Sequence, residues 1–405
     1  MENKVLKPKI RFKGFADTWE QRKLNELTSI ITKGTTPLDK INEGTVNFVK
    51  IENIDSFSGK IDITSKITEK EHNSYLKRSQ LKENDLLFSI AGTLGRVAVV
   101  KSSILPANTN QALAIIRLKN GDINYIKTYL KGKTISDFIR KNPTIGAQPN
   151  LSLEQVNNFD IIMPDKEEQQ KLSALFNSID NLITLHQSKY DKLVNVKKAL
   201  LEKMFPKDGK NVPEIRFKGF TDTWEQRKLG EIATFKQGIQ VDLNKQTTEI
   251  NENSIRFIRI VDYTQNTDDL RYIDKSLAKE YINKEDVVVV RYGATAGFVG
   301  HGISGVLANN MFTINPEKIM TKEYLYTYLK QEKIYKLLNE SNGSSAMPAL
   351  NFTTVKDVNI EYPLPSEQIK ISDMFKQIDN LITLHQHKLE KLKNMKKSLL
   401  NKMFI

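Results

Sequence analysis

Two stretches of the chain, residues 166–205 and 366–405, carry apolar side chains at spacings of three and four residues without any proline or glycine. The main row of this pattern is Leu172, Leu175, Ile179, Leu182, His186, Lys189, Leu193, Val196 and Leu200, repeated as Ile371, Met374, Ile378, Leu381, His385, Lys388, Leu392, Met395 and Leu399. A flanking row widens the stripe with Phe176, Ile183, Tyr190 and Met204, and with Phe375, Ile382, Leu389 and Met403. The periodicity predicts two long helices that pair with each other in a coiled coil. At about 1.5 Å per residue each helix runs roughly 58 Å, which indicates a spacer.

The long stretches are copies of each other. Residues 176–205 and 375–404 are identical at 21 of 30 positions when aligned without gaps. A second repeat, the start box, occurs at residues 10–26 and 215–231 and matches at 15 of 17 positions. A third repeat, the proline box, starts AQPNLSLEQ and AMPALNFTT and leads into each long helix. The chain is therefore a tandem duplication. Each copy has a repeated frame (start box, proline box and long helix) around a divergent segment, which we call the body.

The bodies combine strand and helix patterns. Short β-branched runs predict strands, and longer periodic runs predict helices. Strands are expected at Val46–Ile51, Arg256–Val261, Asp85–Ile90 and Asp286–Arg291, the last two followed by a glycine turn and another strand, and helices at Ile123–Arg140 and Lys322–Asn339. Each body is therefore predicted to be a mixed domain. Divergent bodies on one repeated frame suggest that the two halves bind different targets.

The predicted fold class is α/β (α+β), with two mixed domains joined by two long antiparallel coiled-coil helices and related by pseudo-two-fold symmetry. The boundaries that we predict are 1–165 for the first domain, 166–206 for the first spacer helix, 207–364 for the second domain and 365–405 for the second spacer helix.

Composition narrows the class of protein. The chain has no cysteine, which excludes disulfides and thiolate metal sites, and its N-terminal residues lack an apolar signal-peptide core, so we expect a cytoplasmic protein. No apolar run approaches the roughly 18 residues of a membrane span. Lysine and arginine number 61 against 48 acidic residues, giving a net charge of +13 that favours a polyanionic partner.

No catalytic constellation is visible in the sequence, and we predict no catalytic residue, no metal site and no cofactor in this chain. The glycine segments Gly92–Gly95 and Gly293–Gly297 fit either phosphate-binding loops or plain hairpin turns. His186 and His385 occupy the same position of the two helices, where a polar residue fixes the register of pairing, although a metal site or a pH switch is an alternative. Trp19 lies in the start box, so we expect it to pack the frame.

Candidate DNA contacts are polar and basic residues near predicted turns of the bodies, because these side chains bind base edges and phosphates. In the first body they are Thr32, Lys33, Thr35, Thr36, Lys50, Arg96, Asn108, Asn110 and Gln148. In the second body they are Gln237, Gln240, Arg256, Arg259, Arg291, Tyr292, Asn309, Asn310 and Ser344.

The order of start box, variable body, PNLSLEQVNNFDIIMPDKEEQ and a long helix ending KKALLEKMF, repeated with a different body, resembles the DNA specificity subunit of Type I restriction-modification enzymes. The resemblance covers essentially the whole chain. It implies that each body is a target recognition domain and that the two domains read a bipartite double-stranded DNA sequence. It also implies two methyltransferase subunits and two restriction/translocase subunits as partners, with S-adenosylmethionine, ATP and Mg in those partners. The second proline box has Ala349 where the first has Asn150, so the resemblance assigns no role to that position.

The sequence therefore predicts a non-catalytic, DNA-reading subunit. Two alternatives remain at this point. The first is a coiled-coil scaffolding protein whose lateral domains bind other proteins, and the second is an enzyme that acts alone on DNA.

Overall fold

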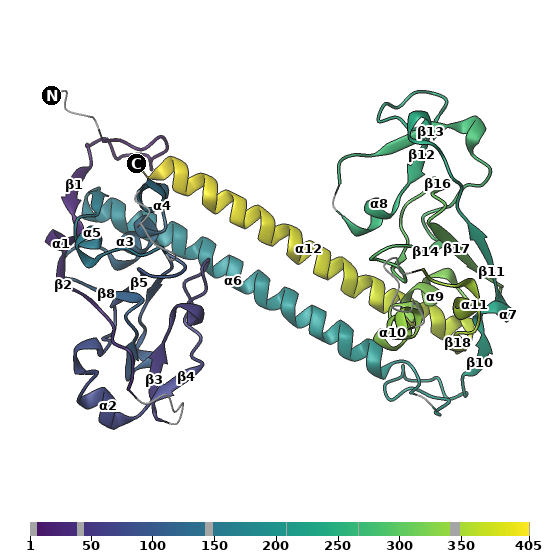
Figure 1. Ribbon diagram of the computed structural model, residues 1–405, viewed down its shortest axis with the longest axis horizontal. Coiled ribbons are helices and arrows are strands. Elements are labelled where there is room, and N and C mark those ends of the chain that lie inside the picture. Colours follow the sequence, from purple (N-terminus) through teal and green to yellow (C-terminus); the bar gives the residue numbers. More distant parts are fainter. Residues whose placement is uncertain are drawn as a thin grey trace. The chain divides into compact units, whose positions relative to one another are not determined.

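The two long helices lie where the apolar heptads predict them (Figure 1). The computed structural model describes residues 6–38, 44–141, 149–207, 209–265, 267–340 and 349–404. Helix α6 spans Lys166–Lys203 and helix α12 spans Pro365–Met403. The chain divides into two units, Met1–Lys189 with His385–Ile405, and Tyr190–Leu384. Each unit therefore contains one body and a section of both long helices.

Within the first unit, α6 and α12 run antiparallel. The ring of Phe404 lies 5.5 Å from that of Phe176, near the start of α6. Further along α6, His186 Nδ1 lies 2.8 Å from His385 Nδ1. Residue numbers thus rise along α6 while they fall along α12, as expected for antiparallel helices.

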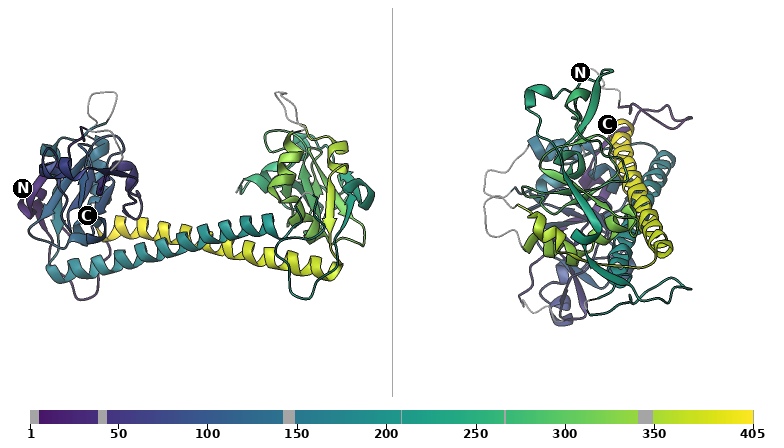
Figure 2. Two further views of the ribbon diagram at one scale, coloured as in Figure 1. Left: turned by 90° about the horizontal axis from the view of Figure 1, so that it is seen from below. Right: turned by 90° about the vertical axis from the view of Figure 1, so that its right-hand side faces the viewer.

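The second unit repeats this arrangement (Figure 2). Lys197 Nζ lies 2.5 Å from Asp379 Oδ1, and the ring of Phe205 lies 6.2 Å from that of Phe375. The predicted fold class, with two mixed domains and antiparallel coiled-coil helices, is confirmed.

The buried seam of the helices corrects the predicted row in part. Leu172 and Ile179 are buried, but Leu182, Lys189 and Val196 of the same row are exposed. The flanking row is buried or half-buried instead, and α12 shows the same difference. The seam of α6 runs through Leu172, Phe176, Ile179, Ile183, His186, Tyr190, Leu193, Lys197, Leu200 and Met204. It alternates between the two rows, except at Lys197, which neither row contains. Apolar spacing alone does not distinguish two rows one residue apart; the contacts of each helix with its neighbours decide which row is covered.

The first unit contains three sheets, with strand orders β1-β9, β2-β8-β5-β6 and β4-β3-β7. All pairs are antiparallel except β3 with β7. Its elements before α6 are β1 (Glu20–Lys23), α1 (Leu24–Leu27), β2 (Thr28–Lys33), β3 (Val46–Val49), η1 (Ile51–Asn53), β4 (Ser65–Ile67), α2 (Glu69–Asn73), η2 (Lys77–Ser79), β5 (Leu86–Ser89), β6 (Val97–Val99), η3 (Ser102–Ile104), β7 (Ala107–Thr109), β8 (Leu113–Leu118), α3 (Ile123–Leu130), α4 (Lys133–Lys141), α5 (Leu153–Asn157) and β9 (Asp160–Met163).

The second unit has the same topology, with strand orders β10-β18, β11-β17-β14-β15 and β13-β12-β16. Its elements before α12 are β10 (Glu225–Lys228), α7 (Leu229–Ile232), β11 (Ala233–Gln237), η4 (Leu243–Lys245), β12 (Ser254–Ile258), α8 (Ile260–Thr264), β13 (Arg271–Asp274), η5 (Lys275–Leu277), β14 (Val287–Val290), β15 (Val299–Gly300), β16 (Val306–Leu307), β17 (Met311–Pro316), α9 (Lys322–Leu329), α10 (Glu332–Glu340), α11 (Phe352–Lys356) and β18 (Asn359–Tyr362). The divergent bodies therefore keep one fold.

Two predicted strands end early. The strands predicted at Val46–Ile51 and Arg256–Val261 end at the last residues of β3 and β12, and a helical turn follows each. Asn53 Oδ1 accepts the backbone N–H three residues before it at 2.8 Å, and Asp262 Oδ2 does the same at 2.6 Å. These side chains cap the start of a helical turn and so stop the strand.

Each predicted body helix is two short helices. The segment Ile123–Arg140 forms α3 and α4, and Lys322–Asn339 forms α9 and α10. The breaks fall at Gly132 and at Gln331, whose backbone N–H groups each donate to the carbonyl three residues earlier. The glycine segments Gly92–Gly95 and Gly293–Gly297 form the turns that link β5 to β6 and β14 to β15.

The start box is fastened to the long helix by a buried ion pair. Arg11 donates from Nε and Nη2 to Glu168 of α6 at 2.8 and 2.7 Å, and Trp19 Nε1 donates to the same carboxylate at 3.0 Å. This hydrogen bonding raises the pKa of Arg11. Arg216 and Glu367 form the same two bonds in the second unit, both at 2.8 Å. Strand β1 also pairs with β9, so Trp19 packs the frame as predicted.

Candidate nucleic-acid interface

In each body, segments that are distant in sequence meet at one end of the four-stranded sheet. In the first body Gly34, directly after β2, donates its N–H to Leu113 O at 3.1 Å, and Leu151 of the proline box donates to Ile90 O at 2.8 Å. In the second body Gly238 donates to Met311 O at 3.0 Å, and Leu350 donates to Arg291 O at 2.8 Å. Four segments therefore meet at this end of each sheet. In the first body they are the end of β2, the end of β5, the turn before β8 and the proline box.

Glycine is required at this end of the sheet because two backbones lie in close contact. A Cβ on Gly34 would lie 2.1 Å from Thr109 O, and one on Gly238 would lie 2.3 Å from Ala308 O. Both distances are far below van der Waals contact. The two bodies therefore hold their backbones in the same register here, and the polar side chains around each glycine occupy equivalent positions.

The second body places six of its nine predicted contacts at this end. We call Gln237, Gln240, Arg291, Tyr292, Asn309 and Asn310 the second cluster. Gln237 Nε2 donates to Asn309 O at 2.7 Å, and Arg291 Nη1 donates to Gln237 Oε1 at 2.9 Å. Asn309 Nδ2 donates to Gln240 Oε1 at 3.3 Å. Four of the six residues, Gln237, Gln240, Arg291 and Asn309, are therefore joined by hydrogen bonds into one network.

The first body has its own group at the equivalent place, the first cluster, which consists of Thr32, Lys33, Thr35, Thr36, Arg78, Asn110 and Gln111. Thr36 Oγ1 bonds to Gln111 Oε1, and Arg78 Nη2 donates to Thr35 Oγ1 at 3.4 Å. Asn110 Oδ1 accepts the N–H of Ala112 at 3.2 Å. Thr36 with Gln111 occupies the positions of Gln240 with Asn309.

Arg78 and Gln111 were not among the candidates from the sequence. Arg78 comes from η2, and only the tertiary fold brings it to Thr35. Gln111 is equivalent to the candidate Asn309, because each lies two residues before the residue whose carbonyl accepts from the glycine, Leu113 for Gly34 and Met311 for Gly238. This equivalence depends on the strand pairing and is not visible in an ungapped alignment of the two glycines.

Several predicted contacts lie away from the clusters. Arg96 Nη1 donates to Ile51 O and Ile54 O at 3.0 and 2.8 Å and so links β6 to the turn after β3. Asn108 is fully buried, and its Nδ2 donates to Leu76 O at 2.8 Å. Their role in binding DNA stays a prediction, as does that of half-buried Lys50.

Two arginines of the second body are held by carboxylates. Arg256 Nη2 lies 2.6 Å from Asp262 Oδ1, and Arg259 Nη1 lies 3.2 Å from Asp269 Oδ2. Their positive charges are therefore already compensated within the body. The remaining candidates, Gln148 and Ser344, lie outside the described residues.

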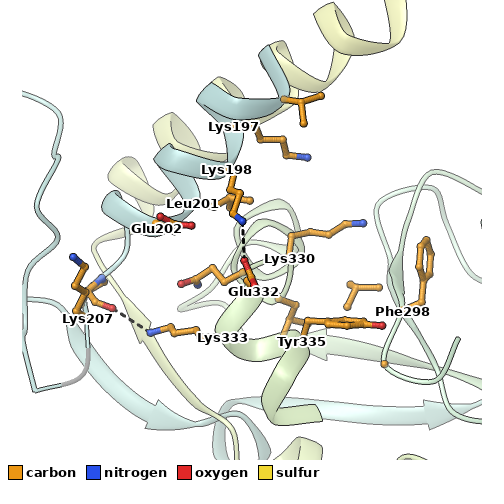
Figure 3. A pocket seen from close by; sticks show the side chains of 16 residues that line it. Lys197, Lys198, Leu201, Glu202, Lys207, Phe298, Lys330, Glu332, Lys333 and Tyr335 are labelled. Carbon is orange, nitrogen blue, oxygen red and sulfur yellow. Dashed lines mark hydrogen bonds and ion pairs between the residues drawn. The ribbon is translucent and has the colours of Figure 1, made fainter. Parts of the chain in front are cut away.

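A second feature recurs where each body meets the long helices. In the second unit a pocket of about 940 Å³ lies between α6 and the break between α9 and α10, with Lys197, Lys198, Leu201 and Lys330 in its lining (Figure 3). The equivalent pocket of the first unit, about 480 Å³, is lined by Lys131, Lys396, Lys397 and Leu400. Burial and the neighbouring Lys396 lower the pKa of Lys131 to about 7. The lining of the second-unit pocket also holds Glu332, whose carboxylate lies 3.3 Å from Lys198 Nζ, whereas the described lining of the first-unit pocket holds lysines and no acidic residue.

Among the described residues, no three His, Asp or Glu side chains gather in a way that suits a metal ion. None of the helices in these ranges is long and apolar enough to cross a membrane.

Both copies of the repeat match a known family. The sequence profile described as "Type I restriction modification DNA specificity domain" matches residues 16–195 and again residues 221–394. The two matches span most of the chain and correspond to its two copies. The chain therefore belongs to the family of Type I restriction-modification specificity subunits.

Similar proteins agree with this assignment. The chain is 22% identical to the putative type I restriction enzyme MjaX specificity subunit of Methanocaldococcus jannaschii, covering 95% of this chain and 92% of that protein. It is 23% identical to the MjaVIII specificity subunit of the same organism over the same shares of both chains. The crystal structure of a Type-I restriction-modification S subunit from M. genitalium has the same fold, with a TM-score of 0.68, 16% identity and 99% coverage of both chains.

Proposed function

We propose that the first and second clusters bind double-stranded DNA and that each reads one half of a bipartite target. The observation that carries this proposal is the difference between side chains at equivalent positions of one backbone. Lys33 and Gln237 are equivalent, as are the pairs Thr36–Gln111 and Gln240–Asn309. A common scaffold with different hydrogen-bonding groups suits recognition of two different base sequences.

The chemistry of the clusters supports DNA over a protein partner. Arginine, lysine, asparagine, glutamine and threonine supply the donors and acceptors that meet base edges and phosphates. The net charge of +13 favours association with a polyanion. Both clusters also lie on the bodies, which diverge between the two copies, and not on the repeated frame.

The proposal includes the partners that family membership suggests. The chain works in the cytoplasm with two methyltransferase subunits and two restriction/translocase subunits. The partners hold S-adenosylmethionine, ATP and Mg and carry out adenine methylation or ATP-dependent cleavage. This chain supplies the recognition and no catalytic residue.

The test is selection of DNA from a library of random duplexes by the purified full chain, alone and with co-expressed partner subunits. We expect the bound fraction to be enriched in a sequence with two defined halves and an undefined gap. The affinity should fall steeply as salt rises, because phosphate contacts release counterions. The chain alone should transfer no methyl group from S-adenosylmethionine to DNA.

Recovery of no enriched sequence would refute the proposal. It would favour the scaffolding alternative if the bodies then captured a protein in a manner insensitive to salt. Methyl transfer by a partner-free preparation would refute the assignment of catalysis to the partners.

A further inference from the structure

The guanidinium of Arg291 is fixed in one orientation at the end of β14. Its Nη1 donates to Gln237 Oε1 at 2.9 Å, and its Nε donates to Leu350 O at 3.4 Å. Its central carbon lies 4.8 Å from the ring centroid of Tyr292 and 4.5 Å from that of Phe352. Two hydrogen bonds and two aromatic rings therefore restrict the rotation of the guanidinium plane.

Arg291 keeps donors that the body does not use. An arginine has five N–H donors in a planar fork, and the two bonds above occupy one on Nε and one on Nη1. In the described part of the chain no carboxylate lies within ion-pair distance of Arg291, whereas Arg256, Arg259 and Arg271 each have one. The positive charge and the Nη2 side of the fork are available to a ligand.

The neighbouring residues leave space beside Arg291. Gly293, two residues later, has a φ of +89°, and no atom of the described residues lies within 4 Å of the place where a Cβ would lie. Gln237 uses both ends of its amide, donating to Asn309 O and accepting from Arg291. Gln237 is thus a positioning residue, and Arg291 is the group that it positions.

We infer that Arg291 reads a guanine in the half of the DNA target that the second body binds. This inference rests on the proposed function. A planar arginine fork matches the O6 and N7 acceptors that guanine presents in the major groove. An orientation fixed before binding also reduces the entropy lost when the contact forms.

The first body argues against a general phosphate contact at this position. Contacts with the DNA backbone serve any sequence, so both halves would need one if this part of the scaffold held a phosphate. The equivalent residue of the first body is Ile90, which is only 5% exposed and has no charge. Only the second body has a charged side chain at this position. This difference is expected if the side chain contacts a base that occurs in one half of the target and not in the other.

The experiment compares DNA selection by the full chain, with the partner subunits that it needs for binding, between the wild type and three variants. Arg291→Ala removes the fork, and Arg291→Lys keeps the charge without the fork. The matched control, Arg227→Ala, removes an exposed arginine from β10, which pairs only with β18. We expect both Arg291 variants to lose discrimination at one guanine of one half by about 5- to 150-fold. The other half and the control should be unchanged.

Gln237→Ala gives a second, milder variant that leaves Arg291 in place. We expect it to weaken discrimination at the same guanine, because it removes the bond that orients the fork. Uniform weakening by Arg291→Ala, with every position of the target still defined, would overturn the inference in favour of a phosphate contact. Loss of discrimination by Arg291→Ala at a base other than guanine would also overturn the inference. In both cases the proposed function would stand. A wild-type chain that enriches no sequence would overturn both.

Discussion

The two halves of the protein contain the same ion pair between the long helices, but they bury it to different extents. In the first unit Lys396 lies 2.5 Å from Asp180, and the two side chains are 5% and 11% exposed. In the second unit Lys197 lies 2.5 Å from Asp379, and the two side chains are 23% and 38% exposed. The residue types and the distance are equal, so the difference comes from what covers each pair.

The bodies supply that cover. In the first unit Phe57 of the body lies over the pair, with its ring centroid 4.6 Å from Lys396 Nζ, and Lys127 Nζ lies 3.9 Å from Asp180. In the second unit Tyr326 occupies the place of Lys127, and both side chains of the pair are more exposed than in the first unit. The frame thus fixes the geometry of the pair, while the divergent body sets how far water screens it.

The largest effect tests whether the bodies are independent in function. Replacing residues 28–145 by the body of another family member exchanges the first cluster and leaves the second unit untouched. We expect a complete change in one half of the DNA target and none in the other half. Sequencing of the selected DNA measures this, and a change in both halves would refute the modular comparison.

Removing the carboxylate of each ion pair tests the difference in burial. Asp180→Ala leaves Lys396 buried without a counter-charge, so we expect the first unit to lose about 3–5 kcal/mol of unfolding free energy. Asp379→Ala should cost the second unit about 1 kcal/mol or less, because the pair is partly screened. Each unit contains one tryptophan, so urea unfolding followed by fluorescence in Trp224→Phe and Trp19→Phe backgrounds reports on each unit separately.

A double variant controls for the lost contacts of the aspartate. Asp180→Ala combined with Lys396→Met removes both charges, so most of the lost stability should return. Equal losses in Asp180→Ala and Asp379→Ala would show that the cover by Phe57 has no energetic consequence.

The two tryptophans of the start boxes give a smaller difference. Trp19 Nε1 donates to Glu168, whereas Trp224 Nε1 is buried and has no hydrogen-bond partner among the described residues. We expect Trp19→Phe to destabilise its unit by about 1 kcal/mol more than Trp224→Phe destabilises the other, because only the first loses a hydrogen bond. Hydrogen exchange of β9 and β18 measures both effects. A larger loss in Trp224→Phe would contradict the expectation.

The histidine pair should give the smallest effect. Burial and the nearby His385 lower the pKa of His186, and Lys189 and Lys388 add to this. The unfolded chain therefore binds the proton more readily than the folded chain does. Stability should fall as the pH drops below the ordinary histidine value of about 6.5 and should be fully present above it. Urea unfolding between pH 5 and 8 measures this, with His186→Gln/His385→Gln as the control, which should lose that dependence.

The pattern of the long helices was sufficient to predict their pairing, but not which row is buried. Lys197 and Lys396 occupy seam positions that neither predicted row contains. Each is stabilised by an aspartate of the other helix, and such pairing depends on the register between two distant segments. A single sequence therefore indicates that one side of each helix is apolar. Which residues along that side are buried depends on how the body packs against the helix.

The sequence predicted which types of residue form the candidate site, but it did not predict every individual residue. All six members of the second cluster were candidates from the sequence, because they follow strand ends that the sequence marks. The same rule selected Asn108, which is buried in β7, and missed Arg78, which reaches Thr35 from a different turn. Proximity to a turn does not determine the direction of a side chain, since that depends on which strands pair.

The aromatic contact of Phe404 has a consequence for the order of folding during synthesis. Its ring stacks on Tyr125 at 5.5 Å in the core of the first unit, although it directly follows α12, which ends at Met403. The ribosome therefore releases the first body long before it makes the residue that completes its core. The second unit, built from the contiguous residues Tyr190–Leu384, contains its own aromatic, Phe205, from the start. The half that is translated first is thus the half that finishes folding last.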